Sequence, residues 1–321
     1  MSFVDFKSRI ARFNRIVEKT DVIDNNEFIK SLKIKESTRD RIRQALNIYL
    51  WSSLSGYYSE KSFELSDDML RDYKDDILAL PNITPNGLIL PKKDNQLAFN
   101  LLCQQVSNSV KELNIDDKID RIQYPINIRL QRGQRDPAFE KRPRASTKIH
   151  TDIWAGDPAG GYLTFLAVLG DPQKVGIRFL HQKNFPEDAV RTLHDYLEGE
   201  DICKGAEEIC RFTDKGWYIS DAYLLHQTTK NDPDAARISI DFRFMPKEKV
   251  ETDTQEDDFR KPYFIAPEFW HKIGSEKLFS TQEVIEEYRG DKNVSQSAYP
   301  VKFNLVDTNE GLNNESFKKT G

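Results

Sequence analysis

From about residue 120 onward, the chain consists largely of short runs rich in β-branched and aromatic residues, each bounded by glycine, proline or aspartate. Such runs are typical of β-strands separated by turns. They are PINIRLQRG (125–133), KIHTDIW (148–154), GYLTFLAVLG (161–170), VGIRFL (175–180), GWYISDAYLLH (216–226) and RISIDFRFM (237–245). This feature limits the chain to folds with a β core.

The first third of the chain has a helical pattern instead. Ser37 or Thr38 can cap a helix in which apolar residues recur every four positions, and residues 61–79 and 94–113 also favour helices. The recurring residues are Ile42, Leu46, Leu50 and Leu54. One more amphipathic helix is expected among the strands, at about 186–198.

This order of elements predicts an α+β chain with a mainly β core. We expect three parts in one unit: a helical N-terminal layer (1–119), a catalytic core (120–248) and a C-terminal extension (249–321). The extension is expected to pack on the core and to have a frayed, polar end. Two independent domains are not expected.

Composition narrows the class of partner. A formal charge of −5 gives no support for nucleic-acid binding, which needs a basic excess on one face. No run has the apolar length of a membrane span, and the first residues lack the continuous apolar stretch of a signal peptide. Three cysteines in no zinc-binding pattern favour a reducing compartment. We therefore expect a cytoplasmic protein with no nucleic-acid or membrane partner, of unknown oligomeric state.

Two of the five histidines stand where a metal site needs them. His150 and Asp152 are two residues apart on an expected strand, so their side chains point to one face. His226 ends a later strand. Two imidazoles and one carboxylate form a facial triad that suits Fe(II) and leaves coordination positions open.

A His-x-Asp pair alone is common, but a specific neighbour follows the third ligand. Arg237 opens the strand after His226, and Ser239 lies on the same strand face. Such an arginine can bind a carboxylate through two parallel hydrogen bonds. Arg243 also shares this face and is the competing candidate, although pairing with Asp241 or a C-terminal acid is the more ordinary role for it.

Taken together, the pattern from His150 to Ser239 resembles the Fe(II)/2-oxoglutarate-dependent dioxygenase superfamily. The resemblance covers about residues 120–248 and implies a double-stranded β-helix (jelly-roll) core. It implies that His150, Asp152 and His226 bind iron, and that Arg237 and Ser239 bind the distal carboxylate of 2-oxoglutarate. It also implies that O2 is consumed, that succinate and CO2 are released, and that hydroxylation is the default outcome.

Substrate-binding residues are expected close to the presumed iron. Asn127, Arg129 and Gln131 form the polar face of one strand, and Trp154 and Asp157 follow the His-x-Asp pair. Each of them also has a plain structural interpretation. Thr164 is a further candidate for the co-substrate and could equally be a strand-filling residue. A small polar metabolite (a natural-product, amino-acid or carbohydrate intermediate) is the expected substrate.

Alternative interpretations remain open at this point. A cupin-like metal-binding isomerase or binding module would not use 2-oxoglutarate and would have no need for Arg237 and Ser239. A non-catalytic β-sandwich would make the triad a coincidence. Protein hydroxylation or demethylation is a third alternative within the same chemistry.

Overall fold

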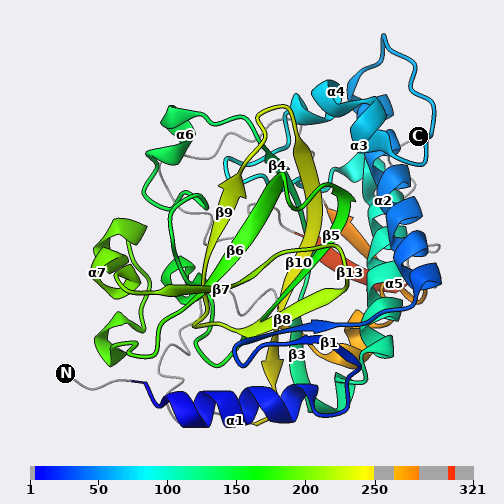
Figure 1. Ribbon diagram of the computed structural model, residues 1–321. Helices are drawn as coiled ribbons and strands as arrows, with labels where there is room; N and C mark the ends of the chain where they lie inside the picture. Colours follow the sequence, from blue (N-terminus) through cyan, green and yellow to red (C-terminus); the bar gives the residue numbers. More distant parts are fainter. Residues whose placement is uncertain (1–3, 249–263, 282–302, 308–321) are drawn as a thin grey trace.

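A computed structural model describes residues 4–248, 264–281 and 303–307. Its centre is an eight-stranded sheet with the order β1-β2-β8-β5-β10-β3-β11, in which β4 also pairs with β10 (Figure 1). All the pairings are antiparallel. The strands are β1 (Val22–Asn25), β2 (Ile29–Leu32), β3 (Ile119–Gln123), β4 (Asn127–Arg132), β5 (Tyr162–Gly170), β8 (Trp217–Asp221), β10 (Ala236–Pro246) and β11 (Phe264–Ile265).

A second sheet of three strands covers part of the first. Its order is β7 (Glu207–Arg211), β6 (Val175–His181) and β9 (Leu225–Lys230), again antiparallel. Aromatic side chains fill the space between the two sheets: the ring of Phe165 on β5 lies 5.7 Å from that of Phe179 on β6. A separate pair joins β12 (Lys277–Thr281) to β13 (Phe303–Asp307).

Two long helices, α2 (Glu36–Tyr57) and α5 (Gln96–Glu112), pack against each other and against the opposite face of the large sheet (Figure 1). Their apolar residues share one core with the sheet residues. Trp217 of β8 belongs to this core and donates a hydrogen bond from its indole nitrogen to Ser109 of α5 at 3.0 Å. Trp270, in the segment 264–281, joins the same core, and its ring centroid lies 5.5 Å from that of Phe242.

The other helices are short, apart from α1. They are α1 (Phe6–Val17), α3 (Met69–Asp72), α4 (Lys74–Leu78), α6 (Pro137–Glu140), α7 (Glu200–Cys203) and α8 (Pro267–Trp270). Five 3-10 turns complete the described elements: η1 (Lys93–Asn95), η2 (Asp116–Lys118), η3 (Asp152–Ala155), η4 (Glu187–Ala189) and η5 (Tyr196–Gly199). No helix in the described part of the chain is long and apolar enough to cross a membrane.

The expected α+β class, with mostly antiparallel sheets, is confirmed. The helix expected at 94–113 is present as α5, and the region 61–79 contains only the short α3 and α4. Capping by Ser37 or Thr38 is wrong. Helix α2 begins at Glu36, and the Thr38 hydroxyl donates to Glu112 at 2.6 Å.

The amphipathic helix expected at 186–198 is also wrong. The backbone N–H of Leu193 donates to Trp154 and that of Tyr196 donates to Pro143, so they bond other segments and not the preceding turn of a helix. Tertiary contacts override the apolar pattern here. The boundaries drawn at 119 and 248 stay a prediction, and the expected frayed end lies outside the described residues.

Candidate metal centre

His150 and His226 are brought together by the backbone. They form an isolated antiparallel bridge, in which each residue donates its N–H to the carbonyl of the other, at 3.0 and 2.8 Å. Their ring centroids lie 4.3 Å apart. His226 belongs to β9, whereas His150 belongs to no strand, so the strand expected over 148–154 is wrong at this point.

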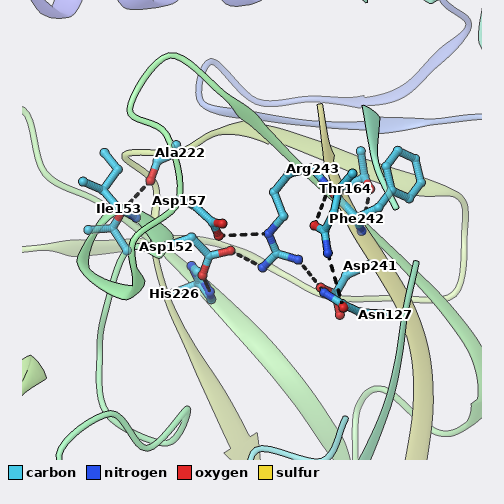
Figure 2. A network of polar contacts seen from close by, with 12 residues as sticks. Asn127, Asp152, Ile153, Asp157, Thr164, Ala222, His226, Asp241, Phe242 and Arg243 are labelled. Atoms are coloured by element: carbon cyan, nitrogen blue, oxygen red, sulfur yellow. Dashed lines mark hydrogen bonds and ion pairs between the residues drawn. The ribbon is translucent and has the colours of Figure 1, made fainter. Parts of the chain in front are cut away.

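Asp152 reaches the same place from the turn η3. The chain leaves the sheet after His150, and the Thr151 hydroxyl anchors this departure by donating to the carbonyl of Ala222 (Figure 2). The carboxylate oxygen Oδ1 of Asp152 then lies 3.4 Å from Nε2 of His226. One candidate ligand atom from each of His150, Asp152 and His226 lies within 4.8 Å of the others, and all three residues are buried. The three predicted metal ligands are therefore adjacent, although strand alternation is not what places Asp152.

Backbone carbonyls determine which ring nitrogen of His150 and His226 can face a metal ion. Nδ1 of His150 contacts the carbonyl of Lys148 at 2.8 Å, and Nδ1 of His226 contacts the carbonyl of Leu224 at 3.1 Å. A carbonyl can only accept, so each ring donates its Nδ1 proton and leaves Nε2 as a lone-pair donor. Neutral rings oriented in this way are the form that a metal ion requires.

The electrostatics favour the metal-binding protonation states. Burial and the neighbouring His226 lower the pKa of His150 to about 3, so this ring is neutral at ordinary pH. Burial alone would raise the pKa of Asp152, but the positive Arg243 and the adjacent His226 outweigh it and hold that pKa well below its usual range. The site therefore offers a carboxylate and a neutral imidazole without further rearrangement.

Arg243 lies at the centre of a buried charge network (Figure 2). Its guanidinium contacts the carboxylates of Asp152 and Asp241, and its Nε donates to Asp157 at 3.0 Å. Asp241 also accepts from Asn127 at 2.8 Å and from Nε of Arg129 at 2.9 Å. The pairing of Arg243 with Asp241 is as expected, and its contact with the candidate ligand Asp152 was not foreseen.

Arg237 is buried like Arg243 but differs from it in its hydrogen-bond partners. Its side chain is fully buried, and none of its three guanidinium nitrogens has a hydrogen-bond partner. Its guanidinium carbon lies 5.0 Å from the ring centroid of Phe212. Burial and the nearby Arg129 lower the pKa of Arg237 to about 9, and Asp241 offsets this in part. Ser239, two residues along β10, is buried on the same strand face.

The polar face predicted on the strand at 125–133 adjoins these residues. In the β4–β10 register, Gln131 is opposite Arg237, Arg129 is opposite Ser239 and Asn127 is opposite Asp241. Their side chains already have protein partners, because Asn127 and Arg129 bind Asp241 and Gln131 donates to the carbonyl of Asn86 at 2.8 Å. A substrate-binding role for them stays a prediction.

The remaining candidates, Trp154, Asp157 and Thr164, are all bonded to other parts of the protein. The Trp154 indole is fully buried and donates to the carbonyl of Ala189 at 3.1 Å, so it packs beneath the site. Asp157 binds Arg243. The Thr164 hydroxyl donates to the carbonyl of Phe242 at 2.8 Å within the large sheet, on the face that packs toward the helices. A role of Thr164 with the co-substrate stays a prediction.

Sequence reasoning named Asp241 only as an ordinary partner of Arg243, and it missed Tyr196. Asp241 shares the strand parity of Arg237, Ser239 and Arg243, and this parity is a signal that could have placed it in the site. Tyr196 stacks on His150 with ring centroids 4.4 Å apart and an interplanar angle of 7°. Nothing in the sequence around Tyr196 indicated this contact, since the segment had been expected to be a helix.

Comparisons with known proteins give distant similarities only. No protein-family model and no curated protein matches the chain. Among solved structures, the α-ketoglutarate-dependent epimerase SnoN of nogalamycin biosynthesis is 12% identical with a TM-score of 0.37, over 74% of this chain and 83% of that chain. The carbocyclase SnoK of the same biosynthesis is 10% identical with a TM-score of 0.38, over 78% and 88%.

An N-substituted L-amino acid dioxygenase from Burkholderia ambifaria AMMD is 11% identical with a TM-score of 0.32, over 74% of this chain and 91% of that chain. With TM-scores below 0.5, these similarities alone assign no function to the chain.

Proposed function

We propose that this chain is an Fe(II)/2-oxoglutarate-dependent dioxygenase with a double-stranded β-helix core. Iron would be held by His150, Asp152 and His226, and 2-oxoglutarate would be anchored by Arg237. The observation that carries the proposal is Arg237, a fully buried guanidinium in which no nitrogen has a hydrogen-bond partner. A buried charge without partners is strongly unfavourable, so this arginine calls for an anionic ligand.

A carboxylate is the anion that fits Arg237 best. The planar guanidinium matches two carboxylate oxygens through parallel hydrogen bonds, and the neighbouring Ser239 hydroxyl can add a third. Arg237 and Ser239 lie on the same face of β10 as Asp241 and Arg243. Arg243 contacts Asp241 and also the candidate metal ligand Asp152. One molecule with a carboxylate at each end could therefore contact Arg237 and the metal centre together.

The donor set fits Fe(II). Two imidazoles and one carboxylate on one side of an ion leave several coordination positions for other ligands. When bound, iron with 2-oxoglutarate and O2 supplies the oxidation of a substrate C–H bond, with succinate and CO2 released.

The chain itself contributes orientation and exclusion of water. His150 and His226 present Nε2 because their Nδ1 protons are bonded to backbone carbonyls. Phe165, Phe179 and Tyr196 surround the two rings. Such apolar walls strengthen the electrostatic interactions inside the site.

The substrate is proposed to be a small polar metabolite. Support comes from the polar residues of β4, of which Arg129 has a partly exposed side chain. The three free thiols of Cys103, Cys203 and Cys210 support action in the reducing cytoplasm. The cupin-like alternative gives no reason for an unpartnered Arg237, so the dioxygenase is preferred.

An anaerobic titration tests the proposal. The metal-free protein is given Fe(II) and then 2-oxoglutarate, and a weak visible charge-transfer band should appear only when both are present. The band should be lost in His226→Ala. In Arg237→Gln it should require at least about tenfold more 2-oxoglutarate, whereas Arg211→Gln, an exposed arginine on β7, should behave like the wild type. Iron binding without any band would favour the cupin-like alternative, and no metal binding would overturn the proposal.

A further inference from the structure

We propose that Arg243 is a positioning residue that holds Asp152 so that a single carboxylate oxygen is left for the metal. This inference rests on the proposed metal site and concerns how the chain prepares it. It also assigns different roles to the two arginines of β10, Arg237 and Arg243, which the sequence had left in competition.

The contacts of Asp152 divide its two oxygens. Oδ2 accepts from the guanidinium of Arg243, whereas Oδ1 lies 3.4 Å from Nε2 of His226, on the side of the two imidazoles. A carboxylate held by one oxygen cannot rotate freely, so only Oδ1 is directed toward a metal at the imidazoles. Arg243 thereby disfavours coordination through both oxygens and keeps one more position open for other ligands.

Arg243 is itself fixed by two more carboxylates. Nε donates to Asp157 at 3.0 Å, and Nη1 contacts Asp241. Asp241 is held in turn by Asn127 and by two nitrogens of Arg129, at 2.9 and 3.3 Å. Each of the three guanidinium nitrogens of Arg243 is therefore engaged by a protein carboxylate, whereas none of those of Arg237 has a hydrogen-bond partner.

Charge and orientation act in opposite directions on metal binding. A positive guanidinium close to a divalent ion repels it, so Arg243 as a mere charge would weaken metal binding. As a clamp, it orients Asp152 before the metal arrives and strengthens binding, and loss of such an orienting partner typically costs about 10–100-fold in metal affinity. The two effects can be separated by experiment, because lysine keeps the charge but lacks the planar fork.

The test is a titration of the metal-free protein with Co(II) alone, following visible absorption. Arg243→Lys should weaken Co(II) binding by about tenfold or more and change the band intensity, which reports coordination number. Arg9→Lys is the matched control, since Arg9 is also a buried arginine that donates two hydrogen bonds to one carboxylate, but its partner is Asp221 and not Asp152. It should stay within about threefold of the wild type.

Several results would overturn the inference. Wild-type affinity in Arg243→Lys, or tighter binding in Arg243→Gln, would mean that the arginine acts only as a charge. Equal weakening in Arg9→Lys would mean a general effect of replacing a buried, paired arginine. If Arg243→Lys unfolds early in a thermal scan, Asp157→Asn replaces it. This change removes one support of Arg243, and an unchanged Co(II) affinity would contradict the clamp. If the wild-type protein binds no Co(II), the proposed metal site itself is wrong. If the wild type binds Co(II) but the Arg243 variants bind it equally well, only the clamp is wrong.

Discussion

His150 and His226 exchange two backbone hydrogen bonds, so the distance between the two imidazoles is set by the main chain and not by a metal. Opposite residues in an antiparallel pair place their side chains on the same side of the sheet. Both rings are also fixed by Nδ1 contacts to the carbonyls of Lys148 and Leu224. The candidate metal centre is consequently built into the fold before any ion binds.

Removing the metal should therefore leave the fold intact. We expect chelator-treated protein to keep its circular dichroism spectrum and one cooperative thermal transition. Adding Fe(II) under anaerobic conditions at about 100 times its dissociation constant should add about 2.7 kcal/mol to the free energy of unfolding. His226→Ala should lose this stabilisation, and the exposed His194→Ala should keep it. Loss of structure on metal removal would contradict this prediction.

Gly199 and Trp154 make a close contact that should not tolerate a methyl group. A Cβ at residue 199 would lie 2.2 Å from Cη2 of Trp154, an indole that is fully buried two residues after Asp152. Gly199→Ala should therefore destabilise the protein by about 1–3 kcal/mol in urea unfolding, because the packed indole has to move. It should also weaken Co(II) binding, since the displaced turn η3 carries Asp152.

A second glycine provides the control for this prediction. Gly56 lies in the last turn of α2, and a Cβ there would meet nothing within 4 Å. Gly56→Ala should raise the free energy of unfolding by up to about 1 kcal/mol, because alanine favours the helix, and it should leave metal binding unchanged. Similar effects of the two substitutions would contradict the packing argument.

Strand β10 was predictable from sequence because alternation is a local property. Ile238, Ile240 and Phe242 pack into the helix-covered core, while Arg237 and its polar neighbours occupy the other face, as a period of two requires. His226 was predictable for a related reason, since it ends the run GWYISDAYLLH, which is rich in apolar residues.

The path of the chain from His150 to Asp152 was not predictable in this way. The turn η3 depends on the contact of Thr151 with Ala222, a residue from a distant part of the sequence. The role of Arg243 likewise depends on Asp157 meeting β10 in space. Long-range contacts of this kind leave no periodic signal, so the sequence indicated candidate residues for the site but not the network that orients them.

Arg9 and Asp221 form a buried ion pair that ties α1 to β8. Two nitrogens of Arg9 donate to the two carboxylate oxygens at 2.9 and 3.1 Å, and the side chains are only 4% and 14% exposed. Arg9→Met should destabilise the protein by about 2–4 kcal/mol in urea unfolding, because it leaves the Asp221 charge largely buried without its partner. Arg9→Met combined with Asp221→Asn should cost less than Arg9→Met alone. A double variant at the sum of the single effects would contradict this coupling.

His181 should make the protein less stable in mild acid. Its ring stacks on Phe28 at 3.5 Å, and burial together with Arg9 and Lys183 lowers its pKa to about 4, from a usual value near 6.5. Between these two values the unfolded chain binds a proton that the folded protein does not, so the free energy of unfolding falls as the pH falls.

His150, with its pKa of about 3, acts in the same direction, so removing one histidine should reduce the effect without abolishing it. Urea unfolding at about pH 7 and about pH 5 should show a smaller loss of stability in His181→Phe than in the wild type. An equal loss in both proteins would mean that the buried ring does not contribute to the acid sensitivity.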